Sequence, residues 1–328
     1  MRNKVLISGL FFLLSACVGE GKKNLGSDCE FIEHILSMGT VFEFQYVDFC
    51  NRSEKNLKIM HQIKSVLDEI ETSMSLYQSE SEIRRLNRTG ILKNPSQEIY
   101  QVVKLSLLHG ELTHGYFDIS VWPVLSLIKQ KSKNGILSFN QNELKKLRLL
   151  VNYKNIALTS KDIRLKRSME ITLDGIAKGF AVDQVSDYLD KAGFRSYLIN
   201  FSGNMKSRGT HANSSPWSVG VLNPETQELY PVSLINEAVA SSGITSQTDN
   251  TVFSKDGKWH HLINPKTLMP ANEMISTTII GPSATVCDVL STATFVMGEK
   301  ESKSILSENY PEYRYRYVTS DRKIVSNF

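Results

Sequence analysis

The chain has 328 residues, with 38 basic and 34 acidic side chains and a formal net charge of +4. This near balance excludes the concentrated basic composition that nucleic-acid binding normally requires. Hydrophobic residues make up 41% of the sequence, which over this length is enough for a large buried core and excludes a disordered tether.

The N-terminus predicts an export signal of the lipoprotein type. Met1-Arg2-Asn3-Lys4 precedes an apolar run from Val5 to Leu14, which is too short to span a bilayer but typical of a secretory signal. The run ends in Ser15-Ala16-Cys17, and small residues directly before a cysteine are typical of bacterial lipoprotein processing. An ordinary secretory signal with a cysteine there by chance is the alternative.

These features predict the domain organisation and the location of the protein. We expect residues 1–16 to be removed, Cys17 to carry the lipid, and residues 17–28 to form a flexible tether. Residues 29–328 then form one folded domain. The protein is expected to be a membrane-anchored lipoprotein that faces the periplasm or the extracytoplasmic side.

Three cysteines remain after Cys17. In an oxidising compartment Cys29 and Cys50 could pair, while Cys287 stays buried and free. Their spacing matches no zinc pattern, and the seven histidines form no His-x-x-x-His pair, so we do not expect a zinc enzyme.

Apolar residues at helical spacing predict a set of helices. Gly193 is expected just beyond the end of the helix at 176–192, and Ser283 is the expected N-cap of the helix that follows Pro282. The expected helices span 55–76, 79–86, 96–109, 144–150, 176–192 and the segment from Pro282 to Gly298.

β-Branched and aromatic runs bounded by Gly, Pro or Asn predict strands between these helices. One or two strands are expected within 31–48, around Met38-Gly39-Thr40. The others are expected at 156–158, 163–165, 171–173, 197–201, 217–221, 238–242 and 275–280. This mixture indicates an α+β or mixed α/β fold, with largely antiparallel sheets flanked by helices.

The segment Asp288-Val289-Leu290-Ser291-Thr292-Ala293 carries the most chemical information. Residues four apart on a helix share a face, so Asp288 and Thr292 can direct two oxygen atoms at one point. Hard cations such as Mg²⁺ prefer oxygen ligands of this kind. The alternative is that Asp288 only stabilises the helix dipole.

Seven segments, in order and across nearly the whole mature chain, resemble those of the ApbE family, whose members are FAD:protein FMN transferases. Two of them, Ala177 to Asp183 and Asp288 to Ala293, are the most specific. The full set is Met38 to Thr40, Met74 to Asn87, Gly115 to Ser120, Gly175 to Asp183, Ser242-Gly243, His261 to Pro265, and Asp288 to Ala293.

The resemblance implies an ApbE-like fold and a Mg²⁺ site. It assigns the carbonyl of Ala177, the carboxylate of Asp288 and the hydroxyl of Thr292 as metal ligands, with the pyrophosphate of FAD completing the shell. Lys178, at a helix start, is then expected to contact the pyrophosphate, because free amide groups and a lysine both favour phosphate. The alternative for Lys178 is a solvated residue of the first turn.

The resemblance also implies an FAD site. Met38, Tyr77 and Asp118, together with Ser242 and Gly243, match positions that line it, although each of the first three could instead be a core or turn residue. His261 is expected to contact the cofactor and to act as the general base towards an incoming hydroxyl; a purely structural role is the alternative.

Four positions depart from the family pattern. Asp174 precedes Gly175 where two glycines are frequent, and Thr172 stands where an acidic residue is common. Leu268 replaces a frequent glycine, and Ser202 replaces the first glycine of a pair before Asn204. These changes affect loops and leave the expected metal ligands intact.

The function implied by the resemblance is Mg²⁺-dependent transfer of FMN from FAD to a Thr or Ser hydroxyl of an acceptor protein, with release of AMP. The expected partner is a flavoprotein subunit of a membrane redox complex. Two alternatives remain open: a Mg²⁺-dependent FAD pyrophosphatase that yields FMN and AMP, and a non-catalytic flavin-binding lipoprotein.

Overall fold

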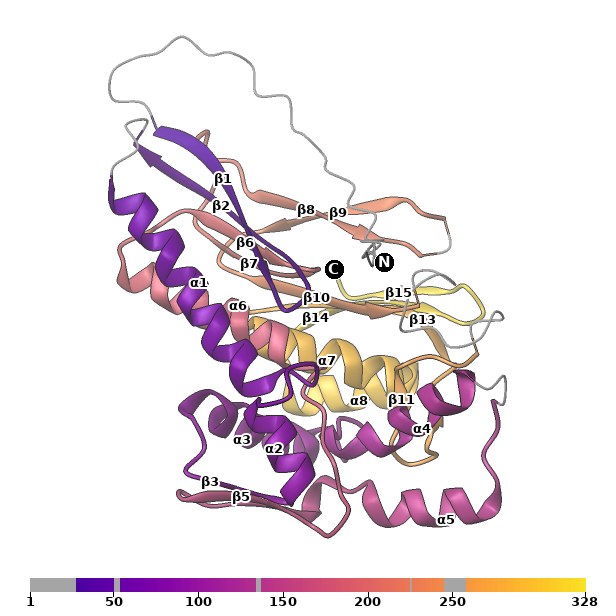
Figure 1. Ribbon diagram of the computed structural model, residues 1–328. Helices are drawn as coiled ribbons and strands as arrows, with labels where there is room; N and C mark the ends of the chain where they lie inside the picture. Colours follow the sequence, from indigo (N-terminus) through magenta and orange to yellow (C-terminus); the bar gives the residue numbers. More distant parts are fainter. Residues whose placement is uncertain (1–27, 50–53, 134–136, 225, 245–257) are drawn as a thin grey trace, which may run out of the picture.

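The computed structural model describes residues 28–49, 54–133, 137–224, 226–244 and 258–328. An eight-stranded antiparallel sheet, in the order β1-β2-β6-β7-β10-β13-β14-β15, is the centre of the fold. Helices α1, α6, α7 and α8 lie along one face of this sheet, and the β8–β9 hairpin lies on the other side (Figure 1). The α+β prediction is therefore confirmed.

The strands of the main sheet are β1 (Asp28–Ser37), β2 (Thr40–Phe49), β6 (Tyr197–Phe201), β7 (Asn204–Arg208), β10 (Ala238–Gly243), β13 (Met274–Gly281), β14 (Arg314–Thr319) and β15 (Ile324–Ser326). Smaller sheets are formed by β3 (Ile91–Lys93), β5 (Asp162–Leu165) and β4 (Ile156–Leu158), by β8 (Trp217–Leu222) and β9 (Leu229–Leu234), and by β11 (Ile263–Asn264) and β12 (Met269–Pro270). The α-helices are α1 (Glu54–Met74), α2 (Glu82–Thr89), α3 (Gln97–Leu112), α4 (Trp122–Lys133), α5 (Gln141–Leu150), α6 (Ala177–Lys191), α7 (Ala284–Met297) and α8 (Glu299–Asn309), with short 3₁₀ turns η1 (Ile119–Val121) and η2 (Tyr153–Asn155).

Alternation along β2 explains how the main sheet covers the core. Phe42, Phe44 and Tyr46 are buried, whereas the residues between them are partly exposed. Successive side chains of a strand point to opposite faces, so these aromatic rings all face the helices. The opposite face of the sheet packs against the β8–β9 hairpin through a separate buried cluster that includes Trp217, Val239 and Ile280.

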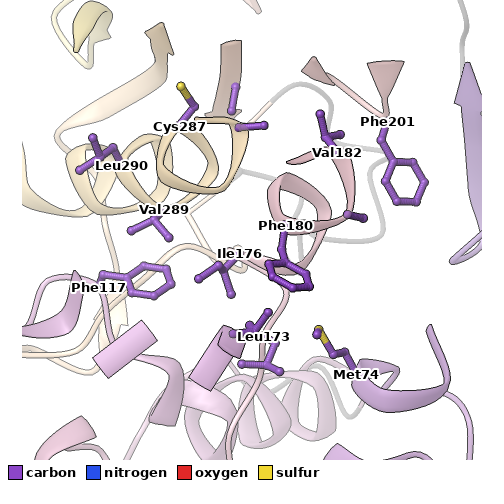
Figure 2. Packing of buried hydrophobic residues seen from close by; sticks show 14 of the residues in the cluster. Met74, Phe117, Leu173, Ile176, Phe180, Val182, Phe201, Cys287, Val289 and Leu290 are labelled. Atoms are coloured by element: carbon purple, nitrogen blue, oxygen red, sulfur yellow. The ribbon is translucent and has the colours of Figure 1, made fainter. Parts of the chain in front are cut away.

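Helices α6 and α7 form the centre of the helical layer. Ile176, Phe180 and Val289 belong to the largest buried cluster of the protein. Figure 2 shows Phe117 and Val289 near Ile176, just before the first turn of α6. Burying side chains of this size contributes about 1.5–3 kcal/mol each, so this cluster fixes the two helices relative to each other.

The prediction of a strand at 171–173 is wrong. These residues form an extended segment outside every sheet, and the Asn87 side chain satisfies the backbone of Ile171: Nδ2 donates to the carbonyl oxygen (2.9 Å) and Oδ1 accepts from the amide (2.8 Å). The Asn87 side chain thus provides the hydrogen bonds to the Ile171 backbone that a neighbouring strand would provide in a sheet. The segment leads directly into α6.

Several further elements are absent from the sequence prediction. Helix α4 begins with Trp122-Pro123 directly after a 3₁₀ turn, and α8 follows α7 after the single residue Gly298. Helix α2 starts three residues later than expected, because the Ser81 hydroxyl accepts the amide of Arg84 and so caps it. None of the described helices is long and apolar enough to cross a bilayer.

Two of the departures from the family pattern occupy left-handed backbone. Ser202 has a φ of 55° and Leu268 a φ of 65°, and glycine adopts this region without steric cost. Ser202 and Gly203, whose φ is 90°, form the two-residue turn between β6 and β7. Two positive φ angles in a row are typical of the type I′ turn of hairpins.

Replacing Ser202 with glycine is expected to stabilise the protein by about 0.5–1 kcal/mol, because it removes the strain of a side chain in left-handed backbone. Urea unfolding measures the change. Ser160, an exposed loop serine without a positive φ, is the matched control, and its change to glycine should be neutral or destabilising. Equal effects at both positions would contradict the explanation.

Candidate functional site

A carboxylate from each of the helices α6 and α7 accepts backbone amides at the N-terminus of the other helix. Asp288 of α7 accepts the amide of Gly179 in the first turn of α6 through Oδ2 (2.9 Å). Asp183 of α6 accepts the amides of Ala284 (3.1 Å) and Thr285 (2.8 Å) at the start of α7. A carboxylate at a helix N-terminus is favoured by the free amides and by the helix dipole. The two helix starts are therefore held side by side.

Gly179 is what allows this close approach. A Cβ atom at this position would lie 2.3 Å from the backbone oxygen of Ala284 and 2.7 Å from the Cβ of Asp288. Real carbon atoms do not approach so closely, so any side chain there would push the two helices apart. The glycine of the Ala177-Lys178-Gly179 segment thus has a packing function.

Asp288 is buried and only partly satisfied. Its exposed fraction is 6%, and Oδ1 accepts no hydrogen bond from any residue that the structure describes. Burial raises the pKa of this carboxyl group, against the opposing effects of the Lys178 charge and the Gly179 amide; the charge of Asp174 raises it further. A buried carboxylate with a remaining lone-pair oxygen is the expected state of a metal ligand without its cation.

Lys178 supplies a cation without a partner. Its side chain is half-buried and forms neither a hydrogen bond nor an ion pair with another described residue, although its charge acts on Asp288. Ala177 is the first residue of α6 and Ile176, the N-cap, makes no capping bond through its side chain. The Ala177 amide donates to the Leu173 carbonyl and the Gly179 amide to Asp288, so the amide and the ammonium group of Lys178 are the groups here that suit a phosphate group.

Hydroxyl groups complete one side of the site. The Ser242 Oγ lies 2.8 Å from the Ser291 Oγ and 3.4 Å from the Thr292 Oγ1. Thr292 lies one helical turn after Asp288, and its Oγ1 is 3.3 Å from where a Cβ on Gly175 would stand. The structure thus brings Asp288, Thr292 and Ser242 together with the segment that enters α6.

The donor set fits Mg²⁺ better than a transition metal. Within the described ranges, no group of three or more His, Cys, Asp or Glu side chains could hold a metal ion. One carboxylate with a hydroxyl and a backbone carbonyl is a ligand set that Mg²⁺ accepts when phosphates and water supply the remaining oxygens. The residues present therefore fit the expected ion.

Met38 lies at a turn with its side chain partly buried against the main hydrophobic cluster, whereas Tyr77 lies in an exposed loop. Met38 starts the β1–β2 turn with a φ of 48°, and its amide donates to Glu71 Oε2 (3.0 Å). A methionine in left-handed backbone is uncommon and points to a functional constraint. Tyr77 is 89% exposed, and partial desolvation of its hydroxyl together with the charge of Asp174 raises its pKa.

Asp118 has a local structural role. Its Oδ1 accepts the amide (2.8 Å) and the hydroxyl (2.6 Å) of Ser120, and Oδ2 accepts the amide of Tyr153 (2.9 Å). Burial raises its pKa, while these hydrogen bonds act in the opposite direction. The structure supports its interpretation as a turn former, and its contact with flavin stays a prediction.

The two adjacent histidines are in different environments. His260 is 1% exposed, accepts the Leu262 amide at Nδ1 (3.2 Å) and donates from Nε2 to the Ala271 carbonyl (2.8 Å). Burial lowers its pKa, against the effect of the hydrogen bond to Ala271. Because Nδ1 accepts a hydrogen bond, His260 is placed as a structural residue. His261, with its ring 6.5 Å from that of His260, is only partly buried.

The segment that follows His261 is tied to α7. Asn264 Oδ1 accepts the amides of Lys266 (2.9 Å) and Thr267 (3.3 Å) in the β11–β12 turn, and its Nδ2 donates to the Val296 carbonyl (3.5 Å). The helix that carries Asp288 therefore also positions the loop that carries His261.

The model of the ApbE family matches residues 38–316, which is most of the chain. The chain belongs to the ApbE family. It is 27% identical to the FAD:protein FMN transferase of Haemophilus influenzae, over 93% of this chain and 91% of that protein, and 26% identical to that of Vibrio cholerae, over 83% of each. The crystal structure of Pseudomonas stutzeri flavinyl transferase ApbE, apo form, superposes with a TM-score of 0.79 at 21% identity, covering 93% of this chain and 96% of that one.

No function was assigned from the sequence to two residues of this ApbE-family site, Asp183 and Asp174. Asp183 lies within the motif, and besides the α7 amides it binds Lys206 Nζ (2.7 Å), Ser283 Oγ (2.7 Å) and Thr285 Oγ1 (2.7 Å). Burial opposes its ionisation, but Lys206 and these hydrogen bonds outweigh burial and lower its pKa. Asp174 acts on Asp288 through its charge. Only the folded structure reveals these partners.

The states of Cys287 and Cys29 agree with the prediction from the sequence. Cys287 is buried and free. Cys29 forms a disulfide, while Cys50 lies outside the described residues, so the Cys29–Cys50 pair stays a prediction. The expected signal peptide, Cys17 and the expected tether up to residue 27 also lie outside the described residues.

Proposed function

We propose that this protein transfers FMN from FAD to a threonine or serine hydroxyl of an acceptor protein in a Mg²⁺-dependent reaction that releases AMP. The observation that carries the proposal is the start of α6, where the buried carboxylate of Asp288 keeps one oxygen without a donor from the described residues. The ammonium group of Lys178, which pairs with none of those residues, acts on this carboxylate through its charge. A cation and a pyrophosphate together would satisfy both groups.

Three groups of this chain would hold the ion: the Ala177 carbonyl, the Asp288 carboxylate and the Thr292 hydroxyl. Bound there, Mg²⁺ would neutralise charge on the pyrophosphate and stabilise the transition state of phosphoryl transfer. Lys178 would hold the phosphate oxygens through its ammonium group and its backbone amide. Tyr77, Met38, Asp118, Ser242 and Gly243 are proposed to bind the remainder of FAD.

The reaction is a displacement at the FMN-side phosphorus of FAD. The oxygen of the acceptor hydroxyl forms a bond to this phosphorus, and the bond from phosphorus to the bridging oxygen breaks, so that AMP leaves with that oxygen. His261 takes the proton of the hydroxyl. The products are AMP and a phosphoester between FMN and the acceptor side chain.

Purified protein incubated with FAD and Mg²⁺, with and without an acceptor flavoprotein subunit of a membrane redox complex, tests this proposal. We expect one AMP per covalently bound FMN, and little AMP without acceptor. Equal AMP release in both samples, with free FMN, would instead identify an FAD pyrophosphatase. FAD binding without AMP in either sample would identify a binding protein.

Replacing His261 with alanine is expected to slow transfer by about 10²- to 10⁴-fold, because general-base catalysis acts on the transition state. Single-turnover transfer at saturating FAD measures this step, and equilibrium titration measures the FAD dissociation constant, which should change little. The His260→Ala variant is the control: it should lose stability, since its two hydrogen bonds are structural. A normal single-turnover rate for His261→Ala would end the base assignment.

We further propose that Cys17 carries a lipid that anchors the protein to a membrane on the extracytoplasmic side. Replacing Cys17 with serine is expected to prevent incorporation of a labelled fatty-acid analogue and to abolish sedimentation with membranes, because several acyl chains provide the binding energy. Cys287→Ser, which affects a buried free thiol, is the control for expression. Labelled Cys17→Ser protein in the membrane pellet would contradict the proposal.

A further inference from the structure

An open cleft at the end of α2 is lined by three arginines. The cleft has a volume of about 590 Å³, and Arg88, Arg164 and Arg167 line it together with residues such as Thr89 and Ser168. No acidic side chain is among its lining residues within the described part of the chain. Like charges around one cleft repel one another, and an anionic partner would relieve the repulsion that remains after Asp162 pairs with Arg164.

Two of these arginines are available for a partner. Arg88 and Arg167 are exposed, and neither forms an ion pair or hydrogen bond with another residue that the structure describes. Arg164 is held in place by Asp162, through Nε to Oδ1 (3.1 Å) and Nη2 to Oδ2 (2.7 Å). The cleft therefore keeps a net positive charge.

The backbone that presents the arginines is well ordered. The Leu165 amide donates to the Gly90 carbonyl (2.8 Å), and β3 pairs with β5 so that Ile91 lies opposite Arg164. Asn87, which also lines the cleft, binds the backbone of Ile171 on both sides. A pre-organised surface loses little entropy when a partner binds.

The shape and position of the cleft favour a protein segment. No aromatic ring lines it, so a nucleotide base would have no stacking surface. The described chain begins at Asp28, at the start of β1, and Figure 1 shows this point at the opposite end of the molecule from β3 and β5. The cleft therefore lies at the end of the molecule away from the point where the expected tether joins the fold.

The cleft is also close to the proposed flavin site. Tyr77 lies just before α2 and Arg88 near the end of this helix, and a helix of this length spans about 12 Å. The opposite wall, which includes Arg167, continues through Ile171 into the segment that carries Asp174 and enters α6. One bound protein can therefore contact the cleft and present a hydroxyl at the flavin site.

We propose that this cleft binds an acidic segment of the acceptor protein, with Arg88 and Arg167 as the main contacts and Arg164 as a third. The proposal rests on the function proposed above. Arginine forks pair bidentately with carboxylates, which gives both orientation and affinity. The acceptor is thereby recognised through a second contact, separate from its modified side chain.

A fluorescein-labelled hexaglutamate peptide tests the cleft without knowledge of the acceptor. The Arg88→Glu/Arg167→Glu variant of the full chain should bind this peptide at least about tenfold more weakly at low ionic strength, and added salt should weaken binding to the wild type. The matched control, Lys191→Glu/Arg195→Glu, reverses two exposed charges that line no part of the cleft. It should bind within about twofold of the wild type. A hexaglutamine peptide should not bind.

Three results would overturn the proposal: unchanged peptide binding by the cleft variant, inorganic phosphate that competes as well as the peptide, or binding to phosphatidylglycerol vesicles that the cleft variant loses while no peptide binds. In transfer assays the cleft variant should show an acceptor KM raised about tenfold, with an unchanged FAD dissociation constant and unchanged kcat. If no FMN transfer occurs but the peptide pattern holds, the proposed function fails and the acidic-segment site remains.

Discussion

The Asp288→Asn variant is expected to lose about 10³-fold in the rate of FMN transfer while remaining as stable as the wild type in the absence of metal, or more stable. The carboxylate is the only acidic ligand proposed for Mg²⁺, and metal charge contributes several kcal/mol to stabilisation of a phosphoryl transition state. The asparagine side-chain oxygen can still accept the Gly179 amide, which Asp288 now accepts at 2.9 Å. The change also removes a buried charge that burial disfavours.

Two measurements on the same preparation check this prediction: single-turnover transfer at saturating FAD and Mg²⁺, and urea unfolding of the metal-free protein at pH 7. Asp187→Asn is the control, since Asp187 is an exposed carboxylate of α6 that forms no hydrogen bond or ion pair with the described residues of the site. A variant of Asp288 that turns over normally would remove this residue from the mechanism. Loss of activity together with a large loss of stability would point to a structural role instead.

The Gly179→Ala variant is expected to lose about 2–3 kcal/mol of stability and at least about 10² in transfer rate. A Cβ atom there would stand 2.3 Å from the Ala284 oxygen, which is backbone and cannot rotate away. Overpacking of a tight contact costs about 1–3 kcal/mol, more than alanine gains over glycine in a helix. Because both metal-ligand helices must shift, the site would be misplaced by a fraction of an ångström or more.

Gly110→Ala is the matched control for this prediction. Gly110 also lies within a helix, but its added Cβ would meet the Tyr153 ring at 2.9 Å, and a side chain can move aside. The control should therefore lose less stability and keep its transfer rate. Urea unfolding and single-turnover kinetics on both variants decide the matter, and equal behaviour of the two glycine variants would contradict the role given to the α6–α7 contact.

The elements that carry the site were largely predictable from sequence, because their local signals agree with their tertiary environment. The α6 pattern ends before Gly193, whose φ is 90°, and Ser283 caps α7 through its hydroxyl as expected. The segment 171–173 misled the prediction, since a β-branched and apolar run indicates burial as readily as it indicates a strand. Its true hydrogen-bond partner, Asn87, lies 84 residues away.

The candidate site was predictable only to the level of residue types. Helical spacing directed Asp288 and Thr292 at one point, and family resemblance gave them the role of metal ligands. The structure brings Thr292 next to Ser242. The reciprocal role of Asp183 depends on a contact across 101 residues of sequence to Ala284, which no spacing rule contains. The basic cleft depends on three arginines from two separate segments, each of which reads as a solvated surface residue by itself.

We propose that the start of α6 and the middle of α7 together hold the metal ion used in FMN transfer. Crystals grown with FAD and Mn²⁺ in place of Mg²⁺ test it most directly, because the anomalous signal of manganese locates the ion. We expect an anomalous peak in contact with the Asp288 carboxylate, the Thr292 hydroxyl and the Ala177 carbonyl, next to the pyrophosphate of FAD. An ordered pyrophosphate with the peak elsewhere, or with no peak, would contradict the account.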